Sequence, residues 1–234
     1  MMEIKTDEVK NGIAGFTFDD RNFPGWQNAV PLFREYHAHA SFFFCGPIDQ
    51  AALNCMEQLR SNGHTVGLHT LDHVDAPEFF LKESAECYFR EQIQPQLDPC
   101  RKAGFQIGSF AYPNNLRNEE TDRFLSRYFH HFRSGCRNLP DNAFIPVSHL
   151  AEHRVMYSRG IGMYYQTRLE DLLEALEHAA EANLAVSFFS HNISPGATGI
   201  NMPTEILEAC LKKASGLGMN IIGFDELPET QTRE

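Results

Sequence analysis

Residues 13–46 read IAGFTFDDRNFPGWQNAVPLFREYHAHASFFFCG, and this segment is the most informative about the architecture of the chain. Its two apolar runs, Ile13–Phe18 and Ser41–Cys45, are short enough to be buried strands. Between them, Pro31–Tyr36 predicts part of a helix that follows a loop with a Pro-Gly pair. Two strands joined by a helical crossover run parallel. The segment therefore predicts a βαβ unit, which is typical of α/β folds.

The alternation of strands and helices continues to the end of the chain. Further strands are predicted at Thr65–Leu68, Gln106–Ala111, His131–Arg133, Arg154–Tyr157, Leu184–Phe189 and Asn220–Gly223. Helices are predicted at 51–61 after an Asp49 N-cap, at 77–102 with breaks near Pro95 and Pro99, and at 118–128, 169–182 and 203–215. About seven strands in this order, with no repeat or linker, predict one α/β domain over residues 1–234 that forms a closed or nearly closed (β/α)7–8 barrel.

The composition describes a folded, acidic protein. Lys and Arg number 20 against 31 Asp and Glu, which gives a net charge of −11 with the 11 His counted as neutral. Since the acidic balance offers no basic face, nucleic acid and anionic membranes are poor candidate partners. No apolar run reaches the roughly 18 residues that a membrane helix needs. The sequence leaves the oligomeric state open.

The first ten residues, MMEIKTDEVK, are charged and lack the apolar core of a signal peptide. This pattern favours a cytoplasmic location for the chain as written. A secreted protein whose signal peptide had been removed would have the same appearance. The predicted location therefore holds for the sequence as written, and a secreted protein is the alternative.

Polar residues follow four of the predicted strands at their carboxyl ends. These segments are Thr17–Asp20, His69–His73, Tyr112–Asn114 and Ser190–His191. In a (β/α) barrel, the loops after the strands build the active site. We therefore expect these residues to meet at one mouth of the barrel, with Tyr112 and Asn114 as candidate substrate-binding residues.

His69 and His73 are four residues apart, a spacing that on one helical turn points both rings the same way and suits one metal ion. The adjacent carboxylates of Asp19 and Asp20 offer a third ligand and a free base. Three protein ligands leave a position for water, whose pKa a zinc ion lowers to roughly 7. Taken alone, an Asp pair is also typical of a turn, and two histidines at this spacing are also typical of an ordinary surface.

Other residues of these types have weaker claims. His149 and His153 share the four-residue spacing, but no acidic strand end accompanies them, which disfavours a second metal site. His191 alone is also typical of a core or loop histidine. Trp26 and the pair Tyr164–Tyr165 could line a sugar pocket, although aromatic residues in loops more often serve packing.

The chain resembles the polysaccharide deacetylase family, whose domain is also called the NodB-homology or carbohydrate esterase family 4 domain. The first motif of the family, T-F-D-D, matches Thr17–Asp20, and the second, H-[ST]-x-x-H, matches His69–His73. The final histidine motif matches Phe188–His191. This resemblance covers roughly residues 13–227 and implies a distorted (β/α)7–8 barrel of the NodB type.

The resemblance also implies a role for each matching residue. It implies Asp19 as general base and His191 as general acid. It implies Asp20, His69 and His73 as ligands of a divalent metal, usually Zn²⁺, with Co²⁺ or Ni²⁺ as alternatives. Water activated by the metal would then remove an acetyl group, and the backbone N–H of Asn114 could hold the oxyanion.

The chain departs from the family pattern in the third motif. Where many members read R-P-P-Y, this chain has Ala111–Asn114, so that Ala111 stands in place of the arginine that orients the base. The candidate substitutes are Arg133, Arg137 and Arg117. The Asp/Trp motif of the family is not recognisable. In the last motif, Phe188 replaces the usual leucine and is expected to narrow the acetyl pocket.

Three functions are consistent with this sequence. The first is a metal-dependent hydrolase that removes acetyl groups from an N- or O-acetylated carbohydrate. The second keeps this chemistry but acts on a small non-sugar amide or imide in the cytosol, which the absent signal peptide and the altered third motif favour. The third is a weakly active carbohydrate-binding relative, since Ala111 removes the charge that orients the base.

Overall fold

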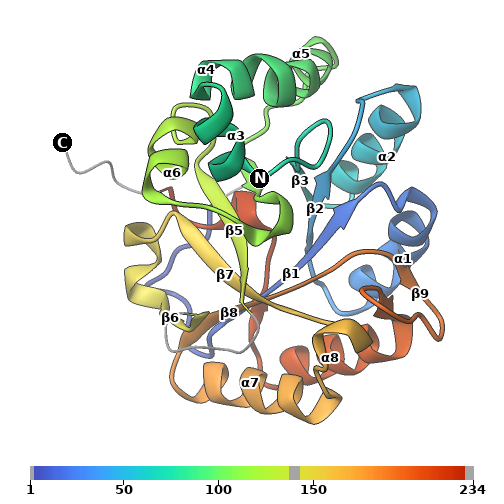
Figure 1. Cartoon of the computed structure of the whole chain (residues 1–234). Coiled ribbons are helices and arrows are strands. Elements are labelled where there is room, and N and C mark those ends of the chain that lie inside the picture. Colours follow the sequence, from blue (N-terminus) through green and yellow to red (C-terminus); the bar gives the residue numbers. More distant parts are fainter. Residues whose placement is uncertain (1–2, 137–142, 230–234) are drawn as a thin grey trace.

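Seven parallel strands form a closed barrel in the computed structural model, which describes residues 3–136 and 143–229 (Figure 1). Their order around the barrel is β1 (Ile13–Asp20), β2 (Ser41–Phe44), β3 (Thr65–Leu68), β4 (Ser109–Ala111), β5 (His131–Cys136), β7 (Val155–Gly160) and β8 (Leu184–Ser190). The barrel closes because β8 pairs with β1 over six register positions, from Ile13 opposite Ala185 to Phe18 opposite Ser190. The predicted α/β barrel is confirmed, with seven strands.

Short strands extend the barrel at its edges. They are β11 (Asn220–Ile221), parallel to β1, and β6 (Ile145–Pro146), antiparallel to β8. A separate parallel pair consists of β9 (Ile193–Ser194) and β10 (Met202–Pro203). The sequence pattern predicts β11, but it contains no signal for the three two-residue strands β6, β9 and β10.

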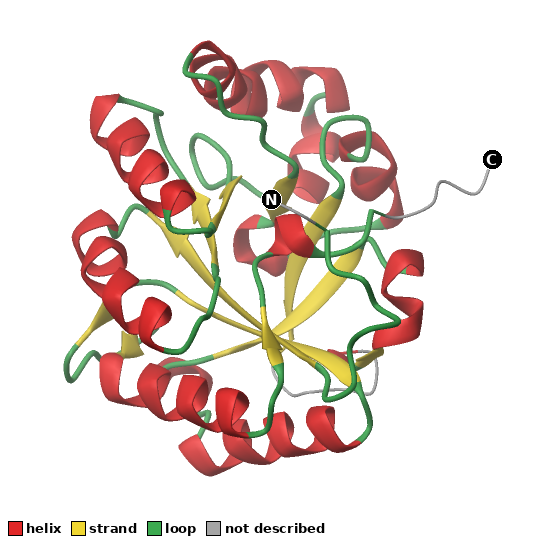
Figure 2. Ribbon diagram, turned by 180° about the vertical axis from the view of Figure 1, so that it is seen from behind, coloured by secondary structure: helices red, strands yellow, loops and turns green. Residues whose placement is uncertain are grey.

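Helices surround the barrel on the outside, as Figure 2 shows from behind. They are α1 (Phe23–Glu35), α2 (Gln50–Ser61), α3 (Ala76–Lys82), α4 (Ala85–Tyr88), the π-helix η1 (Phe89–Ile93), α5 (Gln94–Lys102), α6 (Glu119–Leu125), α7 (Leu169–Glu181) and α8 (Thr204–Gly216). Short 3₁₀ helices are η2 (Pro113–Asn115), η4 (Val147–Glu152), η5 (Met163–Tyr165) and η6 (Phe224–Glu226). Among the described residues, every helix is too short or too polar to cross a membrane.

Two helix boundaries differ from those that the sequence predicts. Helix α1 begins at Phe23 and includes Pro24 and Gly25, which the sequence pattern placed in a loop, because Pro24 lies in the first turn, where a missing N–H costs no hydrogen bond. The long helical segment breaks at Glu83, changes from π-helix to α-helix at Gln94 beside Pro95, and runs without a break through Pro99. Ser84 caps α4 by accepting a hydrogen bond from the Cys87 N–H, which starts a new helix at that point.

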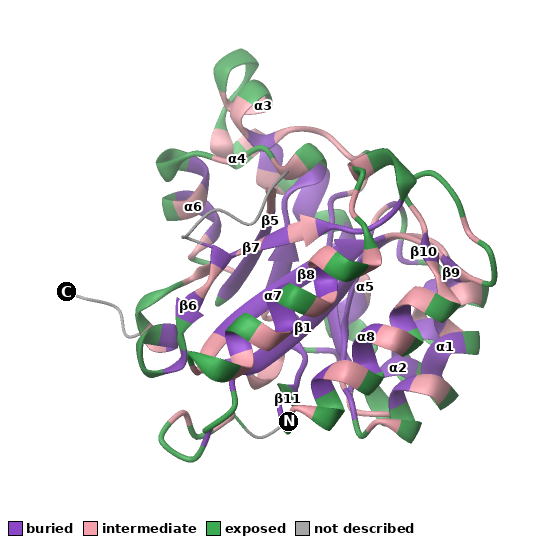
Figure 3. Cartoon of the chain, turned by 90° about the horizontal axis from the view of Figure 1, so that it is seen from below, coloured by how far each residue is buried: buried purple, intermediate pink, exposed green. Residues whose placement is uncertain are grey.

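Both faces of strands such as β1 and β2 are buried, so alternation sorts their side chains by direction and not by polarity, whereas β7 alternates between half-buried and buried residues (Figure 3). Outward-facing rings pack against the helices, as Phe18 does on Phe33 of α1. Inside the barrel, Phe43 fills the space beside Gly67, where a Cβ would lie 2.6 Å from the Phe43 ring. The helices therefore cover an aromatic layer, while the interior keeps room for polar side chains near the carboxyl ends of the strands.

Candidate active site

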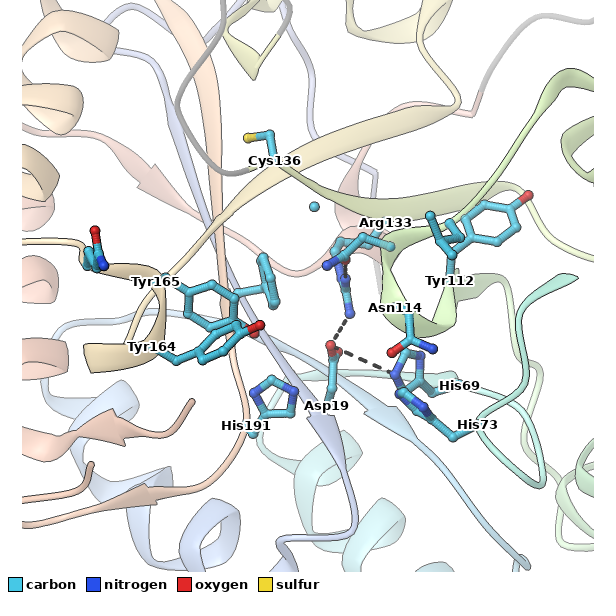
Figure 4. A pocket seen from close by; sticks show the side chains of 15 residues that line it. Asp19, His69, His73, Tyr112, Asn114, Arg133, Cys136, Tyr164, Tyr165 and His191 are labelled. Atoms are coloured by element: carbon cyan, nitrogen blue, oxygen red, sulfur yellow. Dashed lines mark hydrogen bonds and ion pairs between the residues drawn. The ribbon is translucent and has the colours of Figure 1, made fainter. Parts of the chain in front are cut away.

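A cavity of about 900 Å³ opens at the carboxyl ends of the barrel strands (Figure 4). Six of the side chains predicted to form the site line it, namely Asp19, His69, His73, Tyr112, Asn114 and His191. They come from the ends of β1, β3, β4 and β8. Because these strands are parallel, their carboxyl ends lie at the same end of the barrel, and residues far apart in the sequence share one cavity.

Asp20, His69 and His73 form the one group among the described residues that could hold a metal ion. Their candidate ligand atoms all lie within 4.8 Å of one another. The Nδ1 of His69 lies 2.8 Å from the carbonyl oxygen of Ala111. With its proton on Nδ1, His69 donates this bond and leaves Nε2 free for a metal, a support that is common for metal-binding histidines. The donors, two ring nitrogens and one carboxylate, suit Zn²⁺.

The expected helical turn between the two histidines is absent. Residues 69–75 form a loop, in which Thr70 and His73 have left-handed backbones with φ of 68° and 55°. Asp20, at the end of β1, has φ of 82°. Such backbones are costly for residues other than glycine and cluster at functional sites. The loop, and not a helix, brings the two rings to a centroid distance of 4.8 Å.

Asp19 is buried and has two unlike carboxylate oxygens. Its Oδ2 forms an ion pair with Nη2 of Arg133 and lies 4.0 Å from Nε2 of His69. Its Oδ1 has no hydrogen-bond partner among the described residues. Burial alone would raise the pKa of Asp19, but the charge of Arg133 holds it below the ordinary value, with smaller electrostatic contributions from the neighbouring His69 and His191. The carboxylate is therefore ionised, with one oxygen bound and one available.

Of the three candidate arginines, Arg133 is the one that contacts Asp19. The Arg117 guanidinium instead pairs with Asp122 and donates to the Tyr157 hydroxyl. Arg137 lies outside the described residues. The positive charge that is absent at Ala111 therefore enters the site from β5.

His191 lies across Asp19 from the other two histidines (Figure 4). Its Nδ1 is 3.0 Å from the carbonyl oxygen of Ile200, and its Nε2 is 4.0 Å from Oδ2 of Asp20. A hydrogen bond from Nδ1 to the carbonyl fixes the orientation of the ring and presents Nε2 to the cavity. The site thus has the His69 and His73 rings on one side of Asp19 and the His191 ring on the other, and the Asp20 carboxylate lies close to both sides.

The predicted substrate-binding side chains do not all face the cavity. Trp26 is fully buried against Phe42 and Phe44 and does not line the cavity. The Tyr112 ring points away from Asp19 (Figure 4), and its hydroxyl donates to Asp122. The Asn114 side chain lies in the cavity wall, where its Nδ2 donates to Asp75.

Phe188 packs outward on Phe16, and its neighbour Phe189 lines the cavity instead. Successive strand residues point to opposite faces, so the one-residue difference decides which ring meets a substrate. The motif alone does not show the direction of the strand's side chains. The register of β8 against β1 does, because it places Phe189 beside Thr17 on the inner face.

Several residues that line the cavity belong to none of the sequence motifs. They include Asn115, Gln166 and Cys136. Arg133 and the pair Tyr164–Tyr165, which the sequence offered as candidates, also line the cavity. Tyr165 packs its ring on Phe189 at a centroid distance of 5.1 Å, and burial raises its pKa to about 12. The strand–helix alternation could have placed Arg133 at a strand's carboxyl end, but only the barrel register shows that it faces Asp19.

A comparison of the sequence with models of protein families matches the polysaccharide deacetylase model over residues 6–129, more than half of the chain. The chain belongs to the polysaccharide deacetylase family. The match includes both the Asp19–Asp20 and the His69–His73 segments. Membership in the family supports a hydrolase that removes acetyl groups from a carbohydrate.

Solved structures of polysaccharide deacetylases share this fold at low sequence identity. A Mycobacterium smegmatis protein described as a polysaccharide deacetylase has a TM-score of 0.68 and 13% identity, covering 100% of this chain and 98% of that one. The chitin deacetylase of Colletotrichum lindemuthianum has a TM-score of 0.65 and 14% identity, with coverage of 100% and 93%. A peptidoglycan deacetylase from Bacillus subtilis has a TM-score of 0.59 and 14% identity, with coverage of 95% and 91%.

A search of curated protein sequences finds no match to this chain. At such low identity, the solved structures establish the fold of the chain and not its substrate. The function must therefore be argued from its own cavity.

Proposed function

We propose that this protein is a metal-dependent deacetylase that hydrolyses the acetyl group of an N- or O-acetylated carbohydrate. The observation that carries the proposal is the placement of Asp19 between two groups of the cavity. On one side lie His69 and His73, whose donor atoms are grouped with that of Asp20. On the other side lies His191, and one oxygen of Asp19 itself is unpaired. A base, a metal position and an acid together supply the groups for metal-assisted hydrolysis of an amide.

The residues fit a divalent ion. Burial lowers the pKa of His69, against the opposing charge of Asp19, and the neutral imidazole is the form that binds metals. Asp20 adds one negative charge, and the three donors leave a coordination position open. When bound, Zn²⁺ would lower the pKa of a water molecule toward roughly 7 and polarise the acetyl carbonyl.

Asp19 is the proposed general base. Its unpaired Oδ1 accepts the proton of the attacking water, while Oδ2 stays in the ion pair with Arg133. The water oxygen forms a bond to the acetyl carbon, and the carbonyl electrons move to the oxygen. The backbone N–H of Asn114, a residue of the cavity wall, is a candidate donor to that oxyanion.

His191 is the proposed general acid. Protonated at Nε2, it donates that proton to the sugar nitrogen as the carbon–nitrogen bond breaks, which releases acetate and a free amine. For an O-acetyl group, the leaving atom is the sugar oxygen. The proton that Asp19 has taken returns to solvent or to His191, and the cycle closes with one water consumed.

The proposal is tested by metal analysis and acetate release with the purified chain. We expect about one divalent ion per chain and acetate release from N-acetylated or O-acetylated oligosaccharides. Asp19→Asn should lower kcat by about 100-fold or more with the metal retained, whereas Asp20→Ala should lose the metal. Asp49→Asn is a matched control, because Asp49 caps α2 away from the cavity and asparagine caps helices equally well.

The same assay separates the alternatives. A small amide or imide substrate would yield ammonia or a ring-opened acid with no acetate from any sugar, which would overturn the carbohydrate proposal. Tight sugar binding without turnover would favour an inactive relative. The reason for that alternative was the missing charge at Ala111, and Arg133 supplies a charge to Asp19 from another strand.

A further inference from the structure

The Arg133 guanidinium is enclosed inside the barrel mouth, with 1% of the residue exposed. Its Nη2 donates to Oδ2 of Asp19, and its Nη1 donates to Oδ1 of Asn115. Its central carbon lies 4.7 Å from the centroid of the Phe189 ring. A buried charge with this many contacts has one orientation, and the carboxylate that it binds is fixed with it.

Arg133 and Ala111 are register partners on the adjacent parallel strands β5 and β4. Side chains at paired positions of parallel strands point to the same face, so both point into the barrel. The methyl group of Ala111 leaves the neighbouring space open for the long side chain of Arg133. An arginine at position 111 and one at position 133 would compete for the same volume beside Asp19.

We propose that Arg133 is the positioning residue of the base Asp19, assisted by Asn115, and that β5 supplies in this chain the charge that Ala111 of β4 cannot. This inference rests on the proposed hydrolase function. Arg133 acts through Asp19 and is not itself assigned a chemical step. The two adjacent carboxylates therefore have different roles: Asp19 is held in place as the base, and Asp20 is left to bind the metal.

The distances show why such a separation is needed. Oδ2 of Asp19 is only 4.0 Å from Nε2 of His69, one of the candidate ligand atoms. Without the guanidinium, rotation of the carboxylate would bring an oxygen to His69 or to the metal position. The ion pair with Arg133 holds Oδ2 away and leaves Oδ1, which has no partner among the described residues, as the proton acceptor.

The neighbouring residues are built around this contact. Asn115 has a left-handed backbone, with φ of 61°, and its carbonyl oxygen accepts a hydrogen bond from the Ser134 hydroxyl at 2.9 Å. A Cβ on Gly135 would lie 2.4 Å from Cγ of Asn115, so glycine is needed there. The segment 133–135 therefore supplies the guanidinium of Arg133, the hydroxyl of Ser134 that anchors Asn115, and the space beside Gly135 in which the Asn115 amide lies.

The kinetic test removes the arginine from β5 and then places one at the paired position of β4. Arg133→Ala should lower kcat about 100-fold, the effect of misplacing a catalytic group by about 1 Å, with KM changed less than about threefold. The double variant Ala111→Arg/Arg133→Ala should recover at least about tenfold of that loss, and Arg133→Lys should lie between them. Arg159→Ala is the matched control, since Arg159 pairs with Asp171 outside the cavity and should keep its kcat.

A second measurement needs no activity. In metal-free protein, Arg133→Gln should lower the melting temperature by leaving Asp19 as an unpaired buried charge, and adding Asp19→Asn should raise it again. Melting temperatures that simply add, or a kcat for Arg133→Lys and Arg133→Ala equal to that of the wild type, would overturn the inference. An inactive wild type would instead overturn the proposed function, and the melting test would still report on the pair.

Discussion

The indole Nε1–H of Trp26 donates a hydrogen bond to the main-chain carbonyl oxygen of His191 at 2.9 Å. This contact joins α1 to the end of β8. Trp26 is fully buried among aromatic residues, so its ring is held rigidly and holds the carbonyl in turn. Trp26 thus supports the backbone that carries His191, and its buried ring is not available to stack on a sugar.

Replacing Trp26 with Phe should therefore affect both stability and turnover. We expect a loss of about 1–3 kcal/mol in the free energy of unfolding, from the unpaired carbonyl and the smaller ring. We also expect kcat to fall by about tenfold, as the proposed acid loses its support. Phe33→Leu removes a ring from the same cluster without touching His191, so urea denaturation should show a loss while kcat stays unchanged.

Removal of the metal is the second test. Dialysis against a chelator should abolish acetate release, and added Zn²⁺, Co²⁺ or Ni²⁺ should restore it. His73→Ala should bind almost no metal, because two donors hold a divalent ion far more weakly than three. His149→Ala is the control, since His149 is exposed and outside this group. Full activity in a chelated sample with no bound metal would refute the metal dependence.

Tyr164 gives a test of substrate size. It lines the cavity, yet 71% of the residue is exposed, so its ring is available to stack on a sugar face. Tyr164→Ala should lower kcat/KM for an acetylated oligosaccharide by about tenfold, or ~1.4 kcal/mol, and leave hydrolysis of a small acetate ester unchanged. Met163→Ala, equally exposed but outside the cavity lining, should change neither. Equal losses on both substrates would show that Tyr164 has no role in sugar binding.

Asp225 predicts how stability depends on pH. Its carboxylate lies at the opposite end of the barrel from the cavity, where the Ser109 hydroxyl donates to Oδ1 at 2.7 Å and Thr65 Oγ1 accepts from its N–H. Burial raises the pKa of Asp225 from 3.8 to about 6, although the bond from Ser109 opposes the shift. The folded protein therefore favours protonated Asp225 more than the unfolded chain does.

The stabilisation from protonated Asp225 is fully present below pH 3.8 and is lost as the pH rises through about 6. Asp225→Asn keeps an acceptor for Ser109 but cannot ionise. Relative to the wild type, its free energy of unfolding should rise between about pH 4 and pH 7 by ~2 kcal/mol, with kcat unchanged. Urea denaturation across this range measures the difference, and a constant difference at every pH would contradict it.

Local patterns in the sequence predict most of the secondary structure. Short apolar runs predict β1, β2, β3 and β8 within one or two residues, because a strand buried on both faces needs only continuous apolar or small side chains. The Asp49 cap predicts the start of α2, because capping depends on a hydrogen bond three residues along the chain. The break predicted near Pro99 is wrong, since Pro99 lies inside the continuous helix α5. Near Pro95, α5 begins at Gln94 after the π-helix, and Pro95 occupies its first turn without interrupting it.

The sequence by itself determined the barrel and the candidate chemistry of Asp19, Asp20, His69, His73 and His191, because these depend on residue type and on position at strand ends. The tertiary structure alone decided which arginine pairs with Asp19, and that Phe189 and not Phe188 faces the cavity. It also decided that Trp26 supports His191 from within the core. These relationships depend on the register between strands and on which face each side chain takes, and both arise only when residues distant in the sequence pack together.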